Sequence, residues 1–294
     1  MRLKNFLTVG LFLFLMLLIL TGCSQEKVSL NDKAKSEIEY LGTKFVNILN
    51  RLNNITFENY QVTTEKVELS KESAESEKSS ESSSSQSSSE EPAEVKSSGG
   101  NGSSDNTIIA SQMSPNTILN PVTTEIDWAG LKNEIENVYY SWNTVLLDLN
   151  KLDVSNDDIL GFSNDLDKTT TYIKSEDKTN SILAVANLYG YLPKYAETIS
   201  NSSTYMNVMK TKTFILNAYA LIEADDWNGA KGEIDKALET FKLVTTDANF
   251  VSENSHRVNK SYVLLNELRN SLPSQDKDIF YIQYRNLMEV INEL

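Results

Sequence analysis

Residues 131–152 have the sequence LKNEIENVYYSWNTVLLDLNKL and give the clearest indication of the fold class. The large apolar residues of this stretch recur at alternating spacings of four and three residues: Leu131, Ile135, Val138, Trp142, Val145, Leu149 and Leu152. Because an α-helix turns once roughly every 3.6 residues, this spacing places them on one side of a long helix. An apolar side of this kind has to be buried against other apolar surfaces, so the segment predicts a helix packed into a core.

The same spacing continues from there to the end of the chain. It predicts helices over 131–152, 155–173, 182–192, 205–224, 227–244, 258–272 and 275–294. Gly190 and Pro193 predict a kink or a break in the third of these. No segment shows the sustained two-residue alternation of a half-buried strand. We therefore expect an all-α domain over 125–294, a multi-helix bundle or an irregular helical-repeat-like array, with enough residues for its own core.

Residues 205–238 carry small and large side chains at the places where a tetratricopeptide helix pair has them: Ala218, Leu221, Trp227, Ala230, Ile234, Ala237 and Leu238. In this respect the segment is similar to one unit of that repeat family. The resemblance covers a single pair of helices, whereas solenoids of such repeats stack about three units or more. An ordinary helical hairpin with an alanine-rich seam explains the same residues.

A separate amphipathic helix is predicted over 32–55, within the N-terminal part 23–57. Its apolar residues again alternate at spacings of three and four: Ile38, Leu41, Phe45, Ile48, Leu52 and Ile55. A single helix cannot bury such a face alone. We expect it to dock on the chain's own bundle, and the alternatives are pairing with a second copy or with a partner protein.

The segment 58–124 separates this helix from the main domain and has an unusual composition. Sixteen of the 35 residues from 70 to 104 are serine, and acidic residues outnumber lysines there. Such a segment has too little apolar surface to offset the entropy lost on ordering. We therefore expect an acidic, serine-rich, disordered linker.

The first 22 residues have the pattern of a targeting signal. Arg2 and Lys4 precede an uncharged apolar run over 6–20, which is shorter than the roughly 20 residues of a membrane-spanning helix. The run ends in L-T-G-C, residues 20–23, and Cys23 is the only cysteine of the chain. This end resembles the lipobox of bacterial lipoproteins. The resemblance implies cleavage between Gly22 and Cys23 and a diacylglyceryl group on the Cys23 thiol; the alternative is an uncleaved signal anchor.

The order of parts (lipobox, short helix, acidic serine-rich linker, helical domain) resembles uncharacterised lipoproteins of clostridia and related Gram-positive bacteria. That resemblance implies an extracytoplasmic protein held on the cell membrane by the lipid on Cys23. The net charge of −14 and the isoelectric point near 4.6 argue against a nucleic-acid partner, because phosphate binding needs a basic surface.

The sequence contains few of the residues and none of the motifs that would indicate a catalytic site. A single cysteine excludes an intrachain disulfide and metal sites built from several cysteines, and a single histidine, His256, excludes multi-histidine metal sites. Neither a phosphate-binding glycine motif nor a G-x-S-x-G nucleophile motif is present. We expect no enzyme activity and no metal or other cofactor.

Aromatic residues are the remaining candidates for a binding surface. Tyr189, Tyr191 and Tyr195 cluster around the expected break at Gly190 and Pro193, and Trp227 begins a later helix. Flat amphipathic rings suit contacts with a partner, so these four residues are the candidate groove. We expect the domain to act as a helical interaction module for a protein or cell-wall partner. The alternative is a helical bundle that binds a small molecule or metal ligand, accessory to an envelope enzyme or transporter.

Overall fold

The structure is a computed structural model that describes residues 29–57, 117–121 and 123–294. The described residues confirm the all-α class, since they contain no strand beyond an isolated bridge between Thr117 and Asn120. The helices are α2 (Leu30–Leu52), α4 (Trp128–Lys151), α5 (Asn156–Lys174), α6 (Lys178–Tyr189), α7 (Leu192–Ile199), α8 (Ser203–Glu223), α9 (Trp227–Val244), α10 (Ala248–Ser271) and α11 (Lys277–Ile291), with a 3₁₀ turn over Leu272–Ser274.

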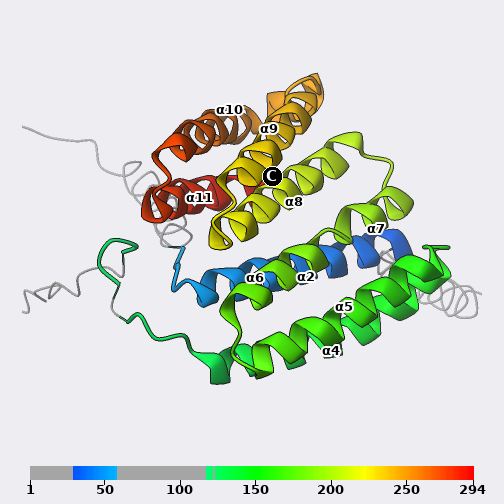
Figure 1. Cartoon of the computed structure of the whole chain (residues 1–294). Helices are drawn as coiled ribbons and strands as arrows, with labels where there is room; N and C mark the ends of the chain where they lie inside the picture. The colour runs from blue at the N-terminus through cyan, green and yellow to red at the C-terminus, as the bar shows by residue number, and fades with distance from the viewer. Residues whose placement is uncertain (1–28, 58–116, 122) are drawn as a thin grey trace, which may run out of the picture.

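The helices form an irregular bundle around α2. Figure 1 shows α2 in the middle of the molecule, with α6 and α7 beside it. The pair α4 and α5 covers one side of α2, and α8 to α11 lie on the other side. Helices that follow one another along the chain pack together in most cases, as in the α8–α9, α10–α11 and α5–α6 pairs.

Helix α2 is part of the core of the bundle. Its buried apolar residues contact α4, α6 and α7: Ala34, Ile38, Leu41, Phe45, Val46, Ile48, Leu49 and Leu52. Polar contacts fix its position as well. The Lys33 ammonium lies 2.5 Å from the Asp148 carboxylate of α4, and the Tyr284 hydroxyl of α11 donates to Asn50 Oδ1 at 3.1 Å. Docking on the chain's own bundle, the first expectation for this helix, is confirmed.

Short connections between helices follow one local rule. A residue with a positive φ ends one helix, and the side chain of the next residue, an aspartate, accepts a backbone N–H bond at the start of the following helix. The pairs are Glu176–Asp177, Asp225–Asp226 and Gln275–Asp276. The left-handed residue reverses the chain and the aspartate satisfies free amide groups of the first turn, so adjacent helices pack side by side.

The expected break near Gly190 and Pro193 is confirmed. Helix α6 ends at Tyr189, and α7 begins at Leu192 with the proline in its first turn. Proline is tolerated there because the first-turn N–H groups have no partner within the helix.

Helix α10 differs from the sequence expectation at its N-terminal end. The apolar spacing predicts a start at 258, but α10 begins at Ala248, where the Asp247 side chain accepts the Phe250 N–H. The added turns hold non-helical angles at Asn254, φ −122° and ψ 23°, which mark a kink. The sequence between Val251 and Val258 is polar, so the added turns are held by the cap and by the packing of Phe250 and Val251 against the core.

The segment with tetratricopeptide-like spacing forms a helical hairpin of α8 and α9. Ala218, Ala230 and Ala237 are fully buried, so their small side chains allow the two helices to pack closely. No described helix is long and apolar enough to cross a membrane. The signal segment 1–22, Cys23 and most of the 58–124 linker lie outside the described residues.

Candidate functional site

A cleft lies between α2, the first half of α8 and the chain end after α11. Its volume is about 530 Å³, within the general range of ligand sites. Buried apolar side chains form its floor, and exposed residues of α2 and of 292–293 form its rim. The apolar lining comprises Ile38, Val46, Phe57, Val208, Met209 and Leu294. The cleft therefore offers an apolar surface with access to solvent.

Lys212 of α8 is the unusual charged residue of this cleft. It lies four residues after Val208 and four before Leu216, so it belongs to the buried side of α8. Burial lowers the pKa of the Lys212 ammonium to about 8, and the nearby Glu39 charge opposes this shift. Within the described residues, the ammonium donates no hydrogen bond and forms no ion pair. The bundle removes part of the water around this cation, and the ammonium lines the cleft without an acceptor in contact.

Two tyrosine hydroxyls adjoin the same cleft. The Tyr205 hydroxyl is buried and makes no hydrogen bond of good geometry, and the Glu39 carboxylate is its neighbouring acceptor. Burial raises the pKa of Tyr205 and of Tyr189, and the Glu39 charge raises both further. Since Glu39 acts on both tyrosines and on Lys212, these polar groups are gathered around one place. The site thus gathers two tyrosine hydroxyls and one ammonium around the Glu39 carboxylate.

Gly42 positions Tyr189 against α2. A Cβ at Gly42 would lie 3.3 Å from Tyr189 Cε2 and 3.3 Å from Leu192 Cδ1. These distances are tighter than ordinary packing, so the absence of a side chain at Gly42 allows α2 to approach α6 and α7 closely. The same close approach brings the Tyr189 ring to the floor of the cleft.

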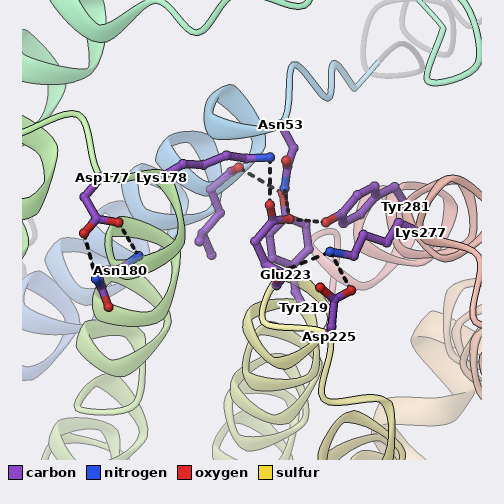
Figure 2. Close-up of polar contacts among 10 residues, drawn as sticks. Asn53, Asp177, Lys178, Asn180, Tyr219, Glu223, Asp225, Lys277 and Tyr281 are labelled. Carbon is purple, nitrogen blue, oxygen red and sulfur yellow. Dashed lines mark hydrogen bonds and ion pairs between the residues drawn. The ribbon is translucent and has the colours of Figure 1, made fainter.

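A second cavity, of about 430 Å³, lies at the opposite end of α2 and is lined in part by Glu223. Figure 2 shows the polar contacts of Glu223. The Glu223 carboxylate accepts a hydrogen bond from the Tyr281 hydroxyl and one from Asn53 Nδ2 at 3.3 Å, and it forms an ion pair with Lys178 Nζ at 2.7 Å. Burial raises the pKa of Glu223, but the contacts with Lys178 and Tyr281 outweigh burial and lower it. The carboxylate is therefore ionised and fully partnered.

The neighbours of Glu223 extend this network to four helices. Asn53 Nδ2 also donates to the Tyr219 hydroxyl at 2.5 Å, and Tyr219 donates in turn to the Leu49 carbonyl at 3.1 Å. Lys277 bonds the Glu223 carbonyl at 3.3 Å and pairs with Asp225 at 2.9 Å, as Figure 2 shows. All these groups are satisfied by one another, so the cluster joins α2, α6, α8 and α11 and leaves little capacity for a ligand.

The four aromatic residues of the predicted groove lie in three different places. Tyr191 and Tyr195 pack with Phe162 and Trp142 in an aromatic cluster beneath α5, and Tyr195 is fully buried. Tyr189 lines the cleft described above, and Trp227 is half-buried at the start of α9. The structure therefore brings Tyr191 and Tyr195 together in one aromatic cluster, while Tyr189 and Trp227 lie elsewhere.

Tyr191 is held by a carboxylate from another helix. Its hydroxyl donates to Asp165 Oδ2 at 2.9 Å, and Asn187 Nδ2 donates to the same oxygen at 2.8 Å. Burial raises the pKa of Tyr191 to about 12, with a further contribution from the bond to Asp165. The described residues contain no group of histidine, cysteine, aspartate and glutamate side chains that could hold a metal ion.

Lys212 and Tyr205 are not among the site residues predicted from the sequence. A signal for Lys212 exists, since a lysine at helical spacing between Val208 and Leu216 interrupts an apolar side. No local signal exists for the Tyr205 hydroxyl, because its surroundings depend on α2, more than 150 residues earlier in the chain. Gly22 and Cys23, the predicted processing site, lie outside the described residues.

Comparison of the chain with known proteins identified no similar protein. No protein-family model matches the chain, and neither the curated proteins nor the solved structures include one similar to it. The similarity of 205–238 to a tetratricopeptide unit therefore stays a likeness of residue spacing. Function has to be inferred from the residues of this chain.

Proposed function

We propose that this protein is a lipid-anchored binding protein of the cell envelope whose helical body takes up a ligand. The L-T-G-C sequence at residues 20–23 supports the anchor, through its resemblance to a lipobox. The cleft around Lys212 supports the binding role. Two acyl chains hold a protein stably on a membrane, whereas one chain gives only marginal attachment.

The observation that carries the binding role is the Lys212 ammonium, which lines a cleft without a protein partner. The Glu223 cluster provides the contrast within the same molecule. Glu223 is also removed from water, yet Lys178, Tyr281 and Asn53 surround it. Buried polar groups are usually satisfied, and an exception is a sign of a missing partner. In this proposal, the missing partner of the Lys212 ammonium is a ligand.

Binding without catalysis accounts best for the groups present. His256, the only histidine, lies exposed on α10 and is not among the residues that line the cleft. The tyrosines of the cleft have raised pKa values and stay protonated near neutral pH, so they donate hydrogen bonds and do not act as bases there.

A second candidate, presentation of the bundle to a protein or cell-wall partner, is favoured by a different observation. Tyr140 and Leu147 of α4 are 69% and 59% exposed, and Leu160 of α5 is 61% exposed. Tyr140 and Leu147 are seven residues apart and share one face of α4. Exposed apolar side chains that share a face are typical of contact surfaces.

Two measurements test the proposal. Metabolic labelling with a fatty acid is expected to mark the wild-type chain and not Cys23→Ala; equal labelling of both would contradict the anchor. The full-length chain is solubilised from envelope extract and analysed by native mass spectrometry. A small bound molecule, absent from Lys212→Met, is the expected result. A stable protein complex that Tyr140→Ser disrupts would favour the second candidate.

A further inference from the structure

The cleft around Lys212 has a charge balance that narrows the chemistry of its ligand. Four charged side chains line it: Lys35, Glu39, Lys212 and Glu293. Lys35 and Glu39 pair at 4.0 Å, and Glu293 pairs with Arg257 of α10 at 2.8 Å. Lys212 has no ion pair at contact distance within the described residues, and Glu39 is the carboxylate whose charge acts on it. A ligand with a single negative charge neutralises the ammonium, whereas a doubly charged anion adds repulsion from Glu39 and Glu293.

The apolar part of the lining indicates the rest of the ligand. Ile38 and Val46 of α2 and Val208 and Met209 of α8 are all buried by the bundle and present their apolar surface to the cleft. Apolar surface gains roughly 25 cal/mol for each Å² removed from water, so an apolar ligand body is favoured there. Met209 also adapts its shape to an irregular neighbour more readily than a branched residue.

Hydrogen-bond donors complete the arrangement. The Tyr205 hydroxyl lies two helical turns before Lys212 on α8 and makes no hydrogen bond of good geometry, with Glu39 as its neighbouring acceptor. Lys35 Nζ lies 4.4 Å from the centre of the Tyr205 ring and adds positive charge on that side. A carboxylate accepts several hydrogen bonds at once, and such bonds from charged donors are stronger than neutral ones.

We propose, building on the binding role above, that the ligand is a small monocarboxylate with an apolar body, whose carboxylate binds the Lys212 ammonium while its apolar part lies on Val208, Met209, Ile38 and Val46. The Tyr205 hydroxyl donates a second hydrogen bond to the ligand. Glu39 lies close enough to repel the carboxylate and so limits the affinity.

The test measures binding of octanoate, 1-octanol and octylamine to the chain 24–294 by isothermal titration calorimetry. These probes share an apolar body and differ in charge. Octanoate is expected to bind most tightly, with about tenfold or greater weakening in Lys212→Met, since a charge-assisted bond is lost. Tyr205→Phe is expected to weaken octanoate binding several-fold, and Glu39→Gln to strengthen it. Lys210→Met is the matched control. Lys210 lies on α8, as Lys212 does, but its ammonium pairs with Glu197 of α7 at 2.6 Å.

A second readout distinguishes a direct charge contact from a change in fold. Above pH 8 the free Lys212 amine is partly neutral, so a bound anion restores its proton. Titrations at pH 8.5 in buffers of different ionisation enthalpy are therefore expected to show proton uptake by the wild type and by Lys210→Met, but not by Lys212→Met. Uptake that persists in Lys212→Met would overturn the assignment of the carboxylate to Lys212.

The outcomes distinguish failure of the monocarboxylate proposal from failure of the proposed binding role. Octanol binding as tight as octanoate, with no effect of Lys212→Met, would overturn the carboxylate and leave the binding role standing. Failure of all three probes, together with protein from the envelope that carries no small molecule, would overturn both.

Discussion

The hydroxyl of Tyr284 in α11 donates a hydrogen bond to Oδ1 of Asn50 in α2, at 3.1 Å, although the two residues are 234 positions apart in the sequence. Both residues are buried. The bond joins the first described helix to the last one, and it does so where no water is available to replace it.

We expect Tyr284→Phe to lower the free energy of unfolding by about 1–2 kcal/mol, because Asn50 then loses its buried donor. Chemical denaturation followed by circular dichroism measures this change. Tyr140→Phe is the control, since Tyr140 is 69% exposed and its hydroxyl is accessible to water. Equal stability of Tyr284→Phe and wild type would show that the bond contributes nothing.

Removal of α2 is expected to abolish cooperative melting. The fragment 121–294 retains α4 to α11 but exposes the apolar surfaces that Leu41, Phe45 and Leu49 cover. A peptide spanning 29–57 is expected to restore a cooperative transition when added, because it supplies those side chains. A sharp thermal transition of the fragment alone, at the wild-type temperature, would contradict this expectation.

Replacement of the Glu223 carboxylate is expected to destabilise the protein and to change its acid sensitivity. Glu223→Gln removes the charge that Lys178 faces, at a cost of about 1–3 kcal/mol near neutral pH. The pKa of Glu223 is lowered in the folded protein, so its contribution is present above the ordinary carboxyl pKa and is lost as the pH falls. The difference between wild type and Glu223→Gln is therefore expected to shrink on acidification.

Glu239→Gln is the matched control for that experiment, because Glu239 is exposed on α9. Its unfolding curve is expected to follow the wild type at every pH. A wild-type pH profile in Glu223→Gln as well would mean that the ion pair and hydrogen bonds of Glu223 are energetically silent.

Lys212→Met is expected to stabilise the ligand-free protein. The folded pKa of Lys212 is about 8, against an ordinary value of 10.5, so the unfolded chain binds more protons between these values. Stability of the wild type therefore rises with pH across that window. At pH 7 the variant is expected to be more stable by roughly 1–3 kcal/mol, and this gain is expected to vanish near pH 10.5.

Urea unfolding at several pH values measures the effect of Lys212→Met. Lys35, Glu39, Tyr189, Tyr205 and Glu293 also adjoin the cleft but are the same in both proteins, so the difference isolates Lys212. Lys210→Met is expected to show no such pH dependence. A destabilised Lys212→Met would indicate that the aliphatic stem of the lysine, and not its charge, dominates at this position.

The sequence predicts most of the helices because their apolar residues follow a regular spacing. The break before Pro193 and the stop after Leu272 are also predictable, since proline cannot continue a helix through its missing N–H. The start of α10 is not, because polar residues separate Phe250 and Val251 from Val258. Two adjacent apolar residues and a cap give too weak a signal to place a helix.

The site is much less predictable than the helices. Lys212 interrupts an apolar side of α8 and is visible in the sequence, but its lack of a partner depends on how α2 and α8 are placed. The Glu223 cluster joins Asn53, Lys178 and Tyr281 from three other parts of the chain, and no local spacing connects them. Among the predicted groove residues, only Tyr189 lies at the cleft, because burial in a core uses most large aromatic side chains.

The central position of α2 also determines how a membrane anchor and the serine-rich segment relate to the body. Phe57 and Ile118, which lie on either side of that segment, both pack against the same core. The segment therefore does not separate the body from the membrane. With a lipid on Cys23, only the few residues before Leu30 do so, and at about 3.5 Å per residue they span at most about 25 Å. A protease that cuts between 58 and 116 would leave the lipid-bearing piece joined to the rest only through the packing of α2. The bilayer would retain the body for as long as that helix stays folded in place.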